Sequence, residues 1–297
     1  MPKSYRNVLI LGATGMLGHT LLRNLSTRPE LTVHATTRSN NGLDHWFSAD
    51  LLVRIHPFVD ADNFDSVMRV LGDVRPDVVV NCIGVIKQLS SAKDPLVTIP
   101  INSLFPHRLA LACKASGSRL VHISTDCVFS GAKGMYTEND PSDADDLYGK
   151  SKYLGEVDYP HCVTLRTSII GHELSTSYSL IDWFLAQEGR VKGFTRAIYT
   201  GFPTVEMARI IADYVIPNES LSGLYQVSSE PISKYDLLKL VAEQYGKQIE
   251  IESFDDFYCD RSLDSTRFRQ KTGYTPPAWP ELVKSMWDDY CATSLIR

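Results

Sequence analysis

NVLILGATGMLGHTLLRNLS, residues 7–26, places a short apolar run directly before a helical pattern, with glycines at positions 12, 15 and 18. The run 7–11 predicts a strand, and the pattern from residue 16 predicts a helix. In this context the first glycine permits a tight turn, the second lets a pyrophosphate approach the backbone, and the third allows close packing of helix on strand. The helix N-terminus supplies unpaired N–H groups. The stretch therefore predicts a dinucleotide-binding turn, although its G-x-x-G-x-x-G spacing differs from the G-x-G-x-x-G fingerprint.

Strands and helices are expected to alternate through the first half of the chain. This spacing predicts right-handed crossovers and a parallel sheet covered by helices on both faces. The expected fold class is α/β, a Rossmann-type doubly wound parallel sheet with a smaller C-terminal substrate-binding region. The further expected strands are 31–38, 77–83, 119–124 and 162–166, and the further expected helices are 61–71, 105–116 and 145–157.

The pattern loosens after residue 166, where prolines punctuate shorter segments. We expect residues 1–170 to form an NAD(P)-binding domain and residues 171–201 and 228–297 to form the substrate-binding region. The segment 202–227 is expected to return to the first domain, because 204–215 has a helical pattern and 223–227 resembles a strand. A further helix is expected at 234–245.

Composition excludes several classes of protein. The 297 residues carry a net charge of −5, with 43% hydrophobic and 22% charged residues, which is globular composition. No basic cluster indicates a nucleic-acid surface, and no window approaches the ~18 apolar residues of a membrane span. Six scattered cysteines without a C-x-x-C pair predict reduced thiols. With no signal-peptide pattern before the first strand, we expect a cytoplasmic protein without a membrane or nucleic-acid partner.

Tyr148 and Lys152 are four residues apart in DDLYGKSKYLGE, residues 145–156. On a helix this spacing places the lysine ammonium beside the phenol, and a nearby cation favours the ionised form of tyrosine. We therefore expect Lys152 to bring the pKa of Tyr148 closer to neutrality. Thr125 follows the strand 119–124, so its hydroxyl should face the ligand crevice of the sheet. Together the three residues predict a proton-transfer site that needs no metal: Tyr148 passes a proton to a carbonyl oxygen, and Thr125 stabilises its developing charge.

The cofactor preference depends on the residues that follow the second strand. Arg38 stands where an NAD site would place a carboxylate, so we expect NADP(H) to be preferred and NAD(H) to remain usable. Asp50 and Leu51 are expected along the adenine, and Gly84 offers a side-chain-free approach to the cofactor. The full set of expected cofactor contacts is Gly12, Thr14, Gly15, Met16, Leu17, Gly18, Arg38, Ser39, Asp50, Leu51, Cys82, Ile83, Gly84, Tyr148 and Lys152.

Several blocks of the sequence, taken in order, resemble the extended short-chain dehydrogenases and most closely the dTDP-4-dehydrorhamnose reductase family. The blocks are GATGMLG, VNCIG, HISTDCVFSGAKGMYTENDP, DDLYGKSKYLGE, LRTSIIG and GFPTVEMA. The resemblance implies NAD(P)H-dependent reduction of a nucleotide-linked 4-keto-6-deoxy sugar in surface polysaccharide synthesis, with Thr125, Tyr148 and Lys152 as catalytic residues. A homodimer is a further expectation. The residues expected to contact the nucleotide-sugar are Val85, Lys87, Asp126, Val128, Phe129, Arg196 and Arg261.

Two departures from the family pattern affect the substrate. Tyr199-Thr200 precedes Gly201 where an aspartate–glutamine pair is expected, and Ile86-Lys87-Gln88 replaces a segment of small residues. The sugar and the nucleotide base therefore stay open. Two alternatives also remain: a nucleotide-sugar epimerase or dehydratase with tightly bound NAD(P), and a non-catalytic regulatory subunit on the same fold.

Overall fold

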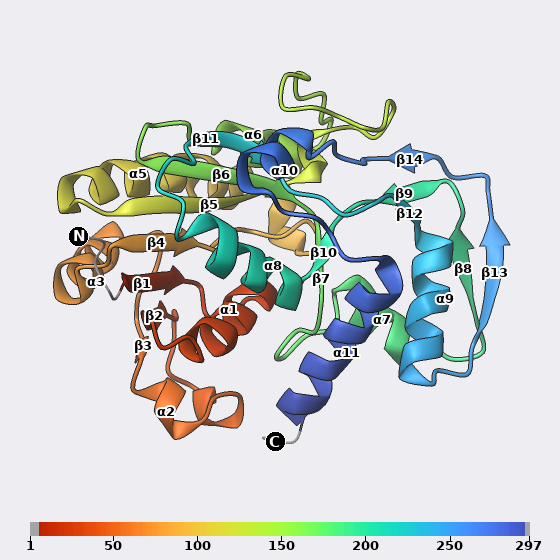
Figure 1. Ribbon diagram of the computed structural model, residues 1–297, viewed down its shortest axis with the longest axis horizontal. Coiled ribbons are helices and arrows are strands. Elements are labelled where there is room, and N and C mark those ends of the chain that lie inside the picture. The colour runs from red at the N-terminus through yellow and green to blue at the C-terminus, as the bar shows by residue number, and fades with distance from the viewer. Residues whose placement is uncertain (1–5, 295–297) are drawn as a thin grey trace.

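The computed structural model describes residues 6–294 and contains a seven-stranded parallel sheet (Figure 1). The strand order is β11-β6-β5-β4-β1-β2-β3, so the winding direction reverses between β1 and β4. Open α/β sheets bind ligands at such a reversal, outside the carboxyl ends of the strands. The strands are β1 (Arg6–Leu11), β2 (Leu31–Thr36), β3 (Ile55–His56), β4 (Val78–Asn81), β5 (Arg119–Thr125), β6 (Cys162–Thr167) and β11 (Gly223–Gln226).

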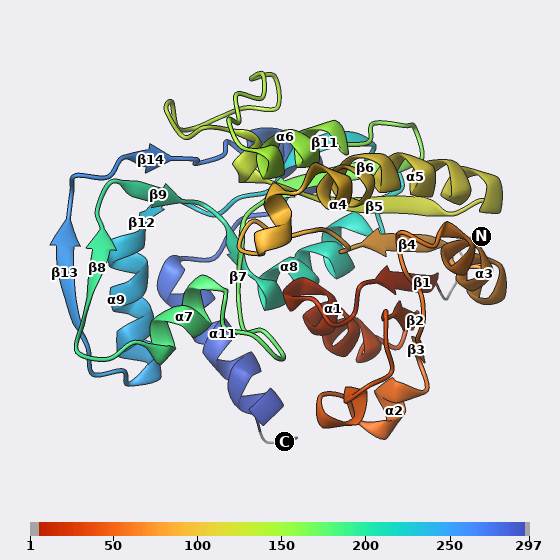
Figure 2. The same ribbon diagram turned by 180° about the vertical axis from the view of Figure 1, so that it is seen from behind.

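Helices cover both faces of this sheet (Figures 1 and 2). On one face α1 (Met16–Ser26) packs against α8 (Thr204–Ile210), which continues as a π-helical segment, residues 211–215. On the other face lie α3 (Phe64–Val74) and α5 (Phe105–Ser116). The helix α4 (Pro95–Ile99) joins α5 through a π-helical turn, and α6 (Leu147–Leu154) packs on β5.

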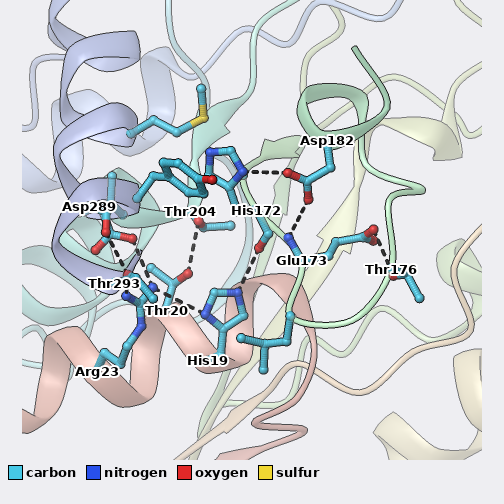
Figure 3. A pocket seen from close by; sticks show the side chains of 15 residues that line it. His19, Thr20, Arg23, His172, Glu173, Thr176, Asp182, Thr204, Asp289 and Thr293 are labelled. Carbon is cyan, nitrogen blue, oxygen red and sulfur yellow. Dashed lines mark hydrogen bonds and ion pairs between the residues drawn. The ribbon is translucent and has the colours of Figure 1, made fainter. Parts of the chain in front are cut away.

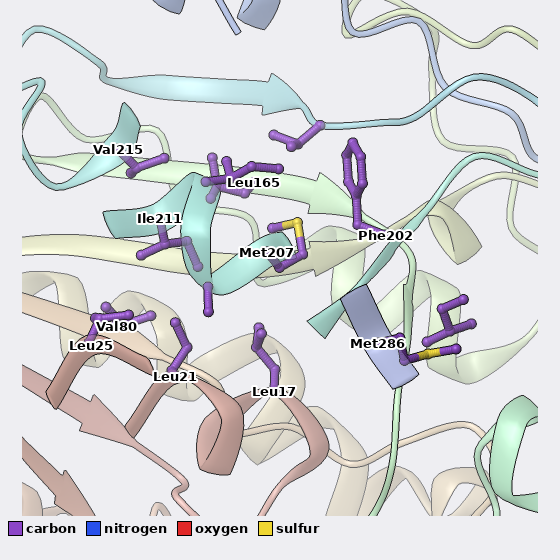
Figure 4. Close-up of a cluster of buried hydrophobic side chains, with 14 of the residues drawn as sticks. Leu17, Leu21, Leu25, Val80, Leu165, Phe202, Met207, Ile211, Val215 and Met286 are labelled. Carbon is purple, nitrogen blue, oxygen red and sulfur yellow. The ribbon is translucent and has the colours of Figure 1, made fainter. Parts of the chain in front are cut away.

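The two hydrophobic cores follow from alternation along the strands. Val8 and Ile10 of β1 are buried with Leu21 of α1 in one core, part of which is drawn in Figure 4. Leu9 and Leu11 are buried in the other core, against α3 and α5. Successive side chains of a strand point to opposite faces, so a strand covered on both sides must be apolar throughout. This explains why NVLIL is an uninterrupted apolar run.

A smaller set of strands and helices lies beyond the carboxyl edge of the sheet. Its strands pair in short ladders: β7 with β10, β13 with β8, and β9 between β12 and β14. The strands are β7 (Ile169–Ile170), β8 (Arg190–Phe194), β9 (Ala197–Tyr199), β10 (Phe202–Pro203), β12 (Ile232–Ser233), β13 (Glu250–Phe254) and β14 (Cys259–Asp260). The remaining helices of the described chain are α2 (Ala49–Leu52), α7 (Leu180–Ala186), α9 (Lys234–Tyr245), α10 (Thr266–Thr272) and α11 (Trp279–Ser294).

The expected α/β class and the expected doubly wound parallel sheet are confirmed, while several element boundaries differ. The helix expected at 61–71 begins at Phe64, because the Asp60 carboxylate accepts a hydrogen bond from the Asp62 backbone and holds residues 60–62 in a turn. The strand expected at 77–83 ends at Asn81, whose side chain accepts from the Ile83 N–H and turns the chain. The strand expected at 223–227 pairs with β6 in the central sheet. The division into two domains remains a prediction.

The six cysteines are free thiols in this structure. Within residues 6–294 no helix has both the length and the apolar character needed to cross a bilayer.

Gly18 has no room for a side chain, and this generates a stability prediction. A Cβ at Gly18 would lie 2.0 Å from the carbonyl oxygen of Gly12, so α1 would have to move off β1. Gly18→Ala should lower the free energy of unfolding by about 1–3 kcal/mol, the usual cost of overpacking. Gly72→Ala is the control, because Gly72 lies in α3 with no neighbouring atom within 4 Å. The control should gain about 0.4–1 kcal/mol. Urea unfolding that leaves Gly18→Ala as stable as wild type would contradict the close approach.

Candidate active site at the carboxyl edge of the sheet

The glycine turn between β1 and α1 has the geometry of a phosphate cradle. Gly12 adopts φ +90°, and its N–H donates to Thr36 Oγ1 at 3.2 Å. Gly15 caps α1 without a side-chain cap, and the turn 14–15 is exposed. The first N–H groups of this 11-residue helix therefore face outward without side-chain acceptors, beside a backbone that carries no Cβ. This arrangement fits the pyrophosphate of a dinucleotide.

Three expected cofactor contacts, Leu17, Asp50 and Leu51, lie where their side chains do not face the glycine turn. The Leu17 side chain is buried in the core, so only its backbone can reach a cofactor. Asp50 and Leu51 lie in α2, which precedes β3, whereas a ligand at the carboxyl edge meets the residues that follow a strand. The segment after β3 contains Phe58, an exposed side chain at φ +63°. Sequence reasoning missed this segment because the two-residue strand β3 leaves no periodic signal.

Arg38 and Ser39 follow β2 at the same edge and are both exposed. Among the described residues, no carboxylate forms an ion pair with the Arg38 guanidinium. An exposed cation beside the glycine turn suits the 2′-phosphate of NADP(H), since a bidentate phosphate contact needs free N–H groups.

The segment after β4, which carries the expected cofactor contacts Cys82, Ile83 and Gly84, lies next to α6. A Cβ at Gly84 would lie 3.9 Å from Lys152 Nζ and 3.3 Å from Asn102 Oδ1. Asn102 is a buried residue that the sequence analysis did not single out. Its Oδ1 accepts from the Val85 N–H at 2.9 Å, and its Nδ2 donates to the Val85 carbonyl at 3.1 Å. This clamp holds Cys82, Ile83 and Gly84 at the edge of the sheet, and it buries Val85, which was expected to contact substrate.

Thr125, Tyr148 and Lys152 converge at the end of β5. Thr125 is the last residue of that strand, and Asp146 caps α6 by accepting from the Gly149 N–H at 2.7 Å. Lys152 Nζ donates to the carbonyl oxygen of Ile123 at 2.8 Å. The Thr125 hydroxyl interacts with the Tyr148 phenol and donates to Asp126 Oδ1 at 3.1 Å, a bond that it must exchange before it can donate to a ligand. The three expected catalytic residues are therefore neighbours.

The pKa of Tyr148 shifts in the direction opposite to the expectation. Although the ring is partly exposed, burial raises the pKa of the phenol above its usual value, and the nearby Cys127 raises it further. The hydrogen bond with Thr125 acts in the opposite direction. Burial also lowers the pKa of Lys152 to about 8, while the Glu156 carboxylate opposes this change. Helical spacing led us to expect a lowered pKa for the phenol, whereas desolvation is the largest effect on Tyr148 and raises it.

The expected substrate contacts separate into residues at the site and residues in the interior. Arg261 directly follows β14 and reaches the loop after β5, where its Nε donates to the Phe129 carbonyl at 2.8 Å and its charge lies near Asp126. Burial raises the pKa of the Asp126 carboxyl. The side chains of Val128 and Phe129 are fully buried, and the Phe129 ring stacks on Tyr136 at 4.1 Å. These two side chains pack a small core and cannot contact a substrate.

The remaining two residues that were expected to contact the substrate, Lys87 and Arg196, are exposed cations. Lys87 Nζ forms an ion pair with Asp146 Oδ2 at 2.6 Å, which ties the 85–89 loop to the start of α6. Arg196 is exposed, with its guanidinium 5.2 Å from the centre of the Tyr258 ring. The described residues contain no group of three or more histidine, cysteine, aspartate or glutamate side chains placed to hold a metal ion.

A cavity of about 270 Å³ lies away from these residues, between α1, α11 and the segment after β7 (Figure 3). Among its lining residues, Arg23 pairs with Asp289 at 3.0 Å, and His172 Nδ1 lies 2.6 Å from Asp182 Oδ1. None of Thr125, Tyr148 and Lys152 lines it. The cavity is therefore not the catalytic crevice.

Comparison with known proteins agrees with this geometry. Residues 6–291 match the family described as the RmlD substrate binding domain. The chain belongs to this family. Spore coat polysaccharide biosynthesis protein SpsK of Bacillus subtilis is 28% identical over 93% of this chain and 95% of its own length. The dTDP-4-dehydrorhamnose reductase of Aggregatibacter actinomycetemcomitans is 26% identical over 94% and 97%.

A relative of a different kind also matches. Methionine adenosyltransferase 2 subunit beta of Danio rerio is 30% identical over 82% of this chain and 75% of its own length. Among solved structures, a hypothetical dTDP-4-dehydrorhamnose reductase of Sulfolobus tokodaii superposes with a TM-score of 0.73 at 26% identity, covering 92% of this chain and 98% of its own. The dTDP-4-dehydrorhamnose reductase of Bacillus anthracis, in complex with NADP, has a TM-score of 0.77 at 20% identity, over 96% and 99%. That likeness supports the fold.

The free guanidinium of Arg38 generates a cofactor prediction. Arg38→Ala should weaken NADPH binding about 10- to 100-fold, as expected from loss of a charge-assisted hydrogen bond worth ~1.5–3 kcal/mol. NADH lacks the 2′-phosphate, so its dissociation constant should stay within about twofold. Arg69→Ala is the control, because Arg69 is exposed on α3. Titration calorimetry that finds equal losses for both dinucleotides would show that Arg38 does not read the phosphate.

Proposed function

We propose that this protein catalyses the NAD(P)H-dependent reduction of a nucleotide-linked 4-keto-6-deoxy sugar. The observation that carries the proposal is the convergence of Thr125, Tyr148 and Lys152 at the carboxyl end of β5, beside a glycine turn suited to a dinucleotide. NADP(H) is the preferred cofactor and NAD(H) is usable. When bound, the reduced dinucleotide supplies the hydride.

Tyr148 delivers the proton to the carbonyl oxygen of the substrate. Burial raises the pKa of its phenol, so Tyr148 is protonated at neutral pH, as a general acid must be. Thr125 donates a hydrogen bond to the same oxygen as negative charge develops there. Lys152 donates to the carbonyl of Ile123, and its role in the proposal is to favour, through its positive charge, the phenolate that remains after proton transfer. The three residues thus protonate and stabilise an alkoxide without a metal ion.

The nucleotide-sugar is expected to lie between the loop that follows β5 and the short strands beyond the carboxyl edge of the sheet. Arg261 at the loop after β5 and Lys87 beside the start of α6 are the cations proposed to meet the diphosphate, and Asp126 is a buried acceptor next to Thr125. Guanidinium groups suit diphosphate through paired hydrogen bonds. The printed names of the relatives, a spore coat polysaccharide protein and a dTDP-4-dehydrorhamnose reductase, support a role in surface polysaccharide synthesis. We further propose that the protein works in the cytoplasm as a homodimer.

A non-catalytic regulatory subunit is the second candidate, and the similarity to methionine adenosyltransferase 2 subunit beta favours it. Such a subunit would not require a tyrosine, a lysine and a threonine in proton-transfer geometry. The reductase is therefore the better reading of the site. An epimerase or dehydratase would use the same residues but would regenerate its cofactor, so net consumption of NADPH separates it from a reductase.

Replacement of the proposed acid tests the reductase. With NADPH and a nucleotide-linked 4-keto-6-deoxy sugar, Tyr148→Phe should lower kcat at least ~10²-fold, because a general acid is lost. NADPH affinity should be unchanged. Tyr153→Phe is the matched control on the same helix, where Tyr153 is exposed. The measurement is the loss of reduced nicotinamide absorbance with dTDP-, UDP- and GDP-linked substrates. Turnover of Tyr148→Phe within about threefold of wild type would reject Tyr148 as the acid.

A further inference from the structure

The carboxylate of Glu156 lies just beyond α6 and is almost completely enclosed. Its Oε1 accepts from Ser124 Oγ and from Arg166 Nε, both at 2.7 Å, and its Oε2 accepts from a terminal nitrogen of Arg166 at 2.7 Å. The Glu156 side chain is 10% exposed and that of Arg166 is 2% exposed. One carboxylate therefore receives three hydrogen bonds in the interior.

These partners belong to the strands that end at the catalytic residues. Ser124 immediately precedes Thr125 on β5, and it is the register partner of Arg166 on β6. Glu156 follows Lys152 by four residues, and Lys152 itself donates to Ile123, the residue before Ser124. Two adjacent hydrogen bonds thus join the end of α6 to the end of β5. Lys152 donates to the backbone of Ile123, and the Glu156 carboxylate accepts from the Ser124 side chain.

Stability alone does not account for this ion pair. Burial of two charges costs as much as their attraction returns in most proteins. The pair is also incompletely satisfied, because Arg166 Nη1 is buried without a hydrogen-bond partner while the guanidinium stacks over the Phe129 ring. An apolar contact would seal this part of the core at lower cost, but it would accept no hydrogen bond from Ser124 or Arg166 and would put no negative charge near Lys152.

We propose that Glu156 is a positioning residue that fixes Lys152 relative to Thr125 by tying the end of α6 to β5 and β6. The inference rests on the proposed reductase function. Glu156 also sets the charge environment of Lys152. Burial disfavours the ammonium, Glu156 and the Cys82 thiol favour it, and His122 on β5 and the Tyr148 phenol are further titratable groups in this part of the site.

The chain offers a matched control for the loss of a buried carboxylate. Glu206 on α8 is 6% exposed and accepts two hydrogen bonds from Arg209 and one from the Tyr274 hydroxyl. Like Glu156, it therefore accepts from one guanidinium group and one hydroxyl group. It has no hydrogen bond to Thr125, Tyr148 or Lys152. Substitution at either position removes a charge from a similar environment.

The experiment compares Glu156→Gln with Glu206→Gln. Both variants should lose stability, but only Glu156→Gln should lower kcat about tenfold while KM stays within about twofold, because displacement of a catalytic group acts on the transition state.

The second readout is the pH titration of the Lys152 side-chain nitrogen by NMR without substrate, assigned through Lys152→Arg. In wild type the pKa should lie near the value of about 8 set by burial. Loss of the carboxylate should move it to lower pH, because the ammonium loses its neighbouring negative charge.

The outcomes distinguish the inference from the proposed function. If Glu156→Gln leaves the Lys152 titration unchanged and alters kcat no more than Glu206→Gln does, the positioning role is wrong. If no variant, wild type included, consumes NADPH but the titration moves, the reductase proposal fails and the tie to Lys152 stands. Ser124→Ala covers the case in which Glu156→Gln does not fold, since it removes only the bond to β5. It should lower kcat about three- to tenfold with KM unchanged, and a wild-type kcat would overturn the proposal.

Discussion

The strands of the central sheet all run in one direction, and the candidate site depends on this constraint. Parallel pairing brings the carboxyl ends of β1, β2, β4 and β5 to a single edge, so residues from four distant parts of the sequence meet there. The contact of Gly18 with Gly12 seats α1 against that edge, with its N-terminus open to phosphate. Without this close approach the glycine turn would not lie beside the β4 segment and α6.

Burial determines the chemistry at this edge. It raises the pKa of the Tyr148 phenol and lowers the pKa of the Lys152 ammonium to about 8, so two groups of nearly equal acidity in water become clearly different here. The side chains that hold these elements in place are polar but buried: Asn102 binds the segment after β4, and Glu156 binds the end of α6 to β5. The site is therefore assembled by buried hydrogen bonds to side chains from neighbouring elements.

Sequence reasoning predicted the parts of this arrangement that local patterns encode. The strand, glycine turn and helix of residues 7–26 and the four-residue spacing of Tyr148 and Lys152 are such patterns. It placed Asp50 and Leu51 at the adenine because β3 is only two residues long, and it assigned Val128 and Phe129 to the substrate although they pack against Tyr136 and Leu263. The short ladders β7–β10 and β9–β12 were also not predicted, because two-residue pairings between distant segments leave no periodicity.

Isotope transfer from the cofactor is the most direct test of the central claim. NADPH carrying deuterium at C4 of the nicotinamide, labelled on each face in turn, is incubated with the protein and a nucleotide-linked 4-keto-6-deoxy sugar. A reductase of the proposed kind predicts one NADP⁺ formed per sugar consumed, with deuterium at C4 of the sugar from one of the two labelled forms. A product without deuterium, or conversion without net loss of NADPH, would contradict the account and favour an epimerase or dehydratase. Absence of any conversion across the nucleotide-linked substrates would favour a regulatory subunit.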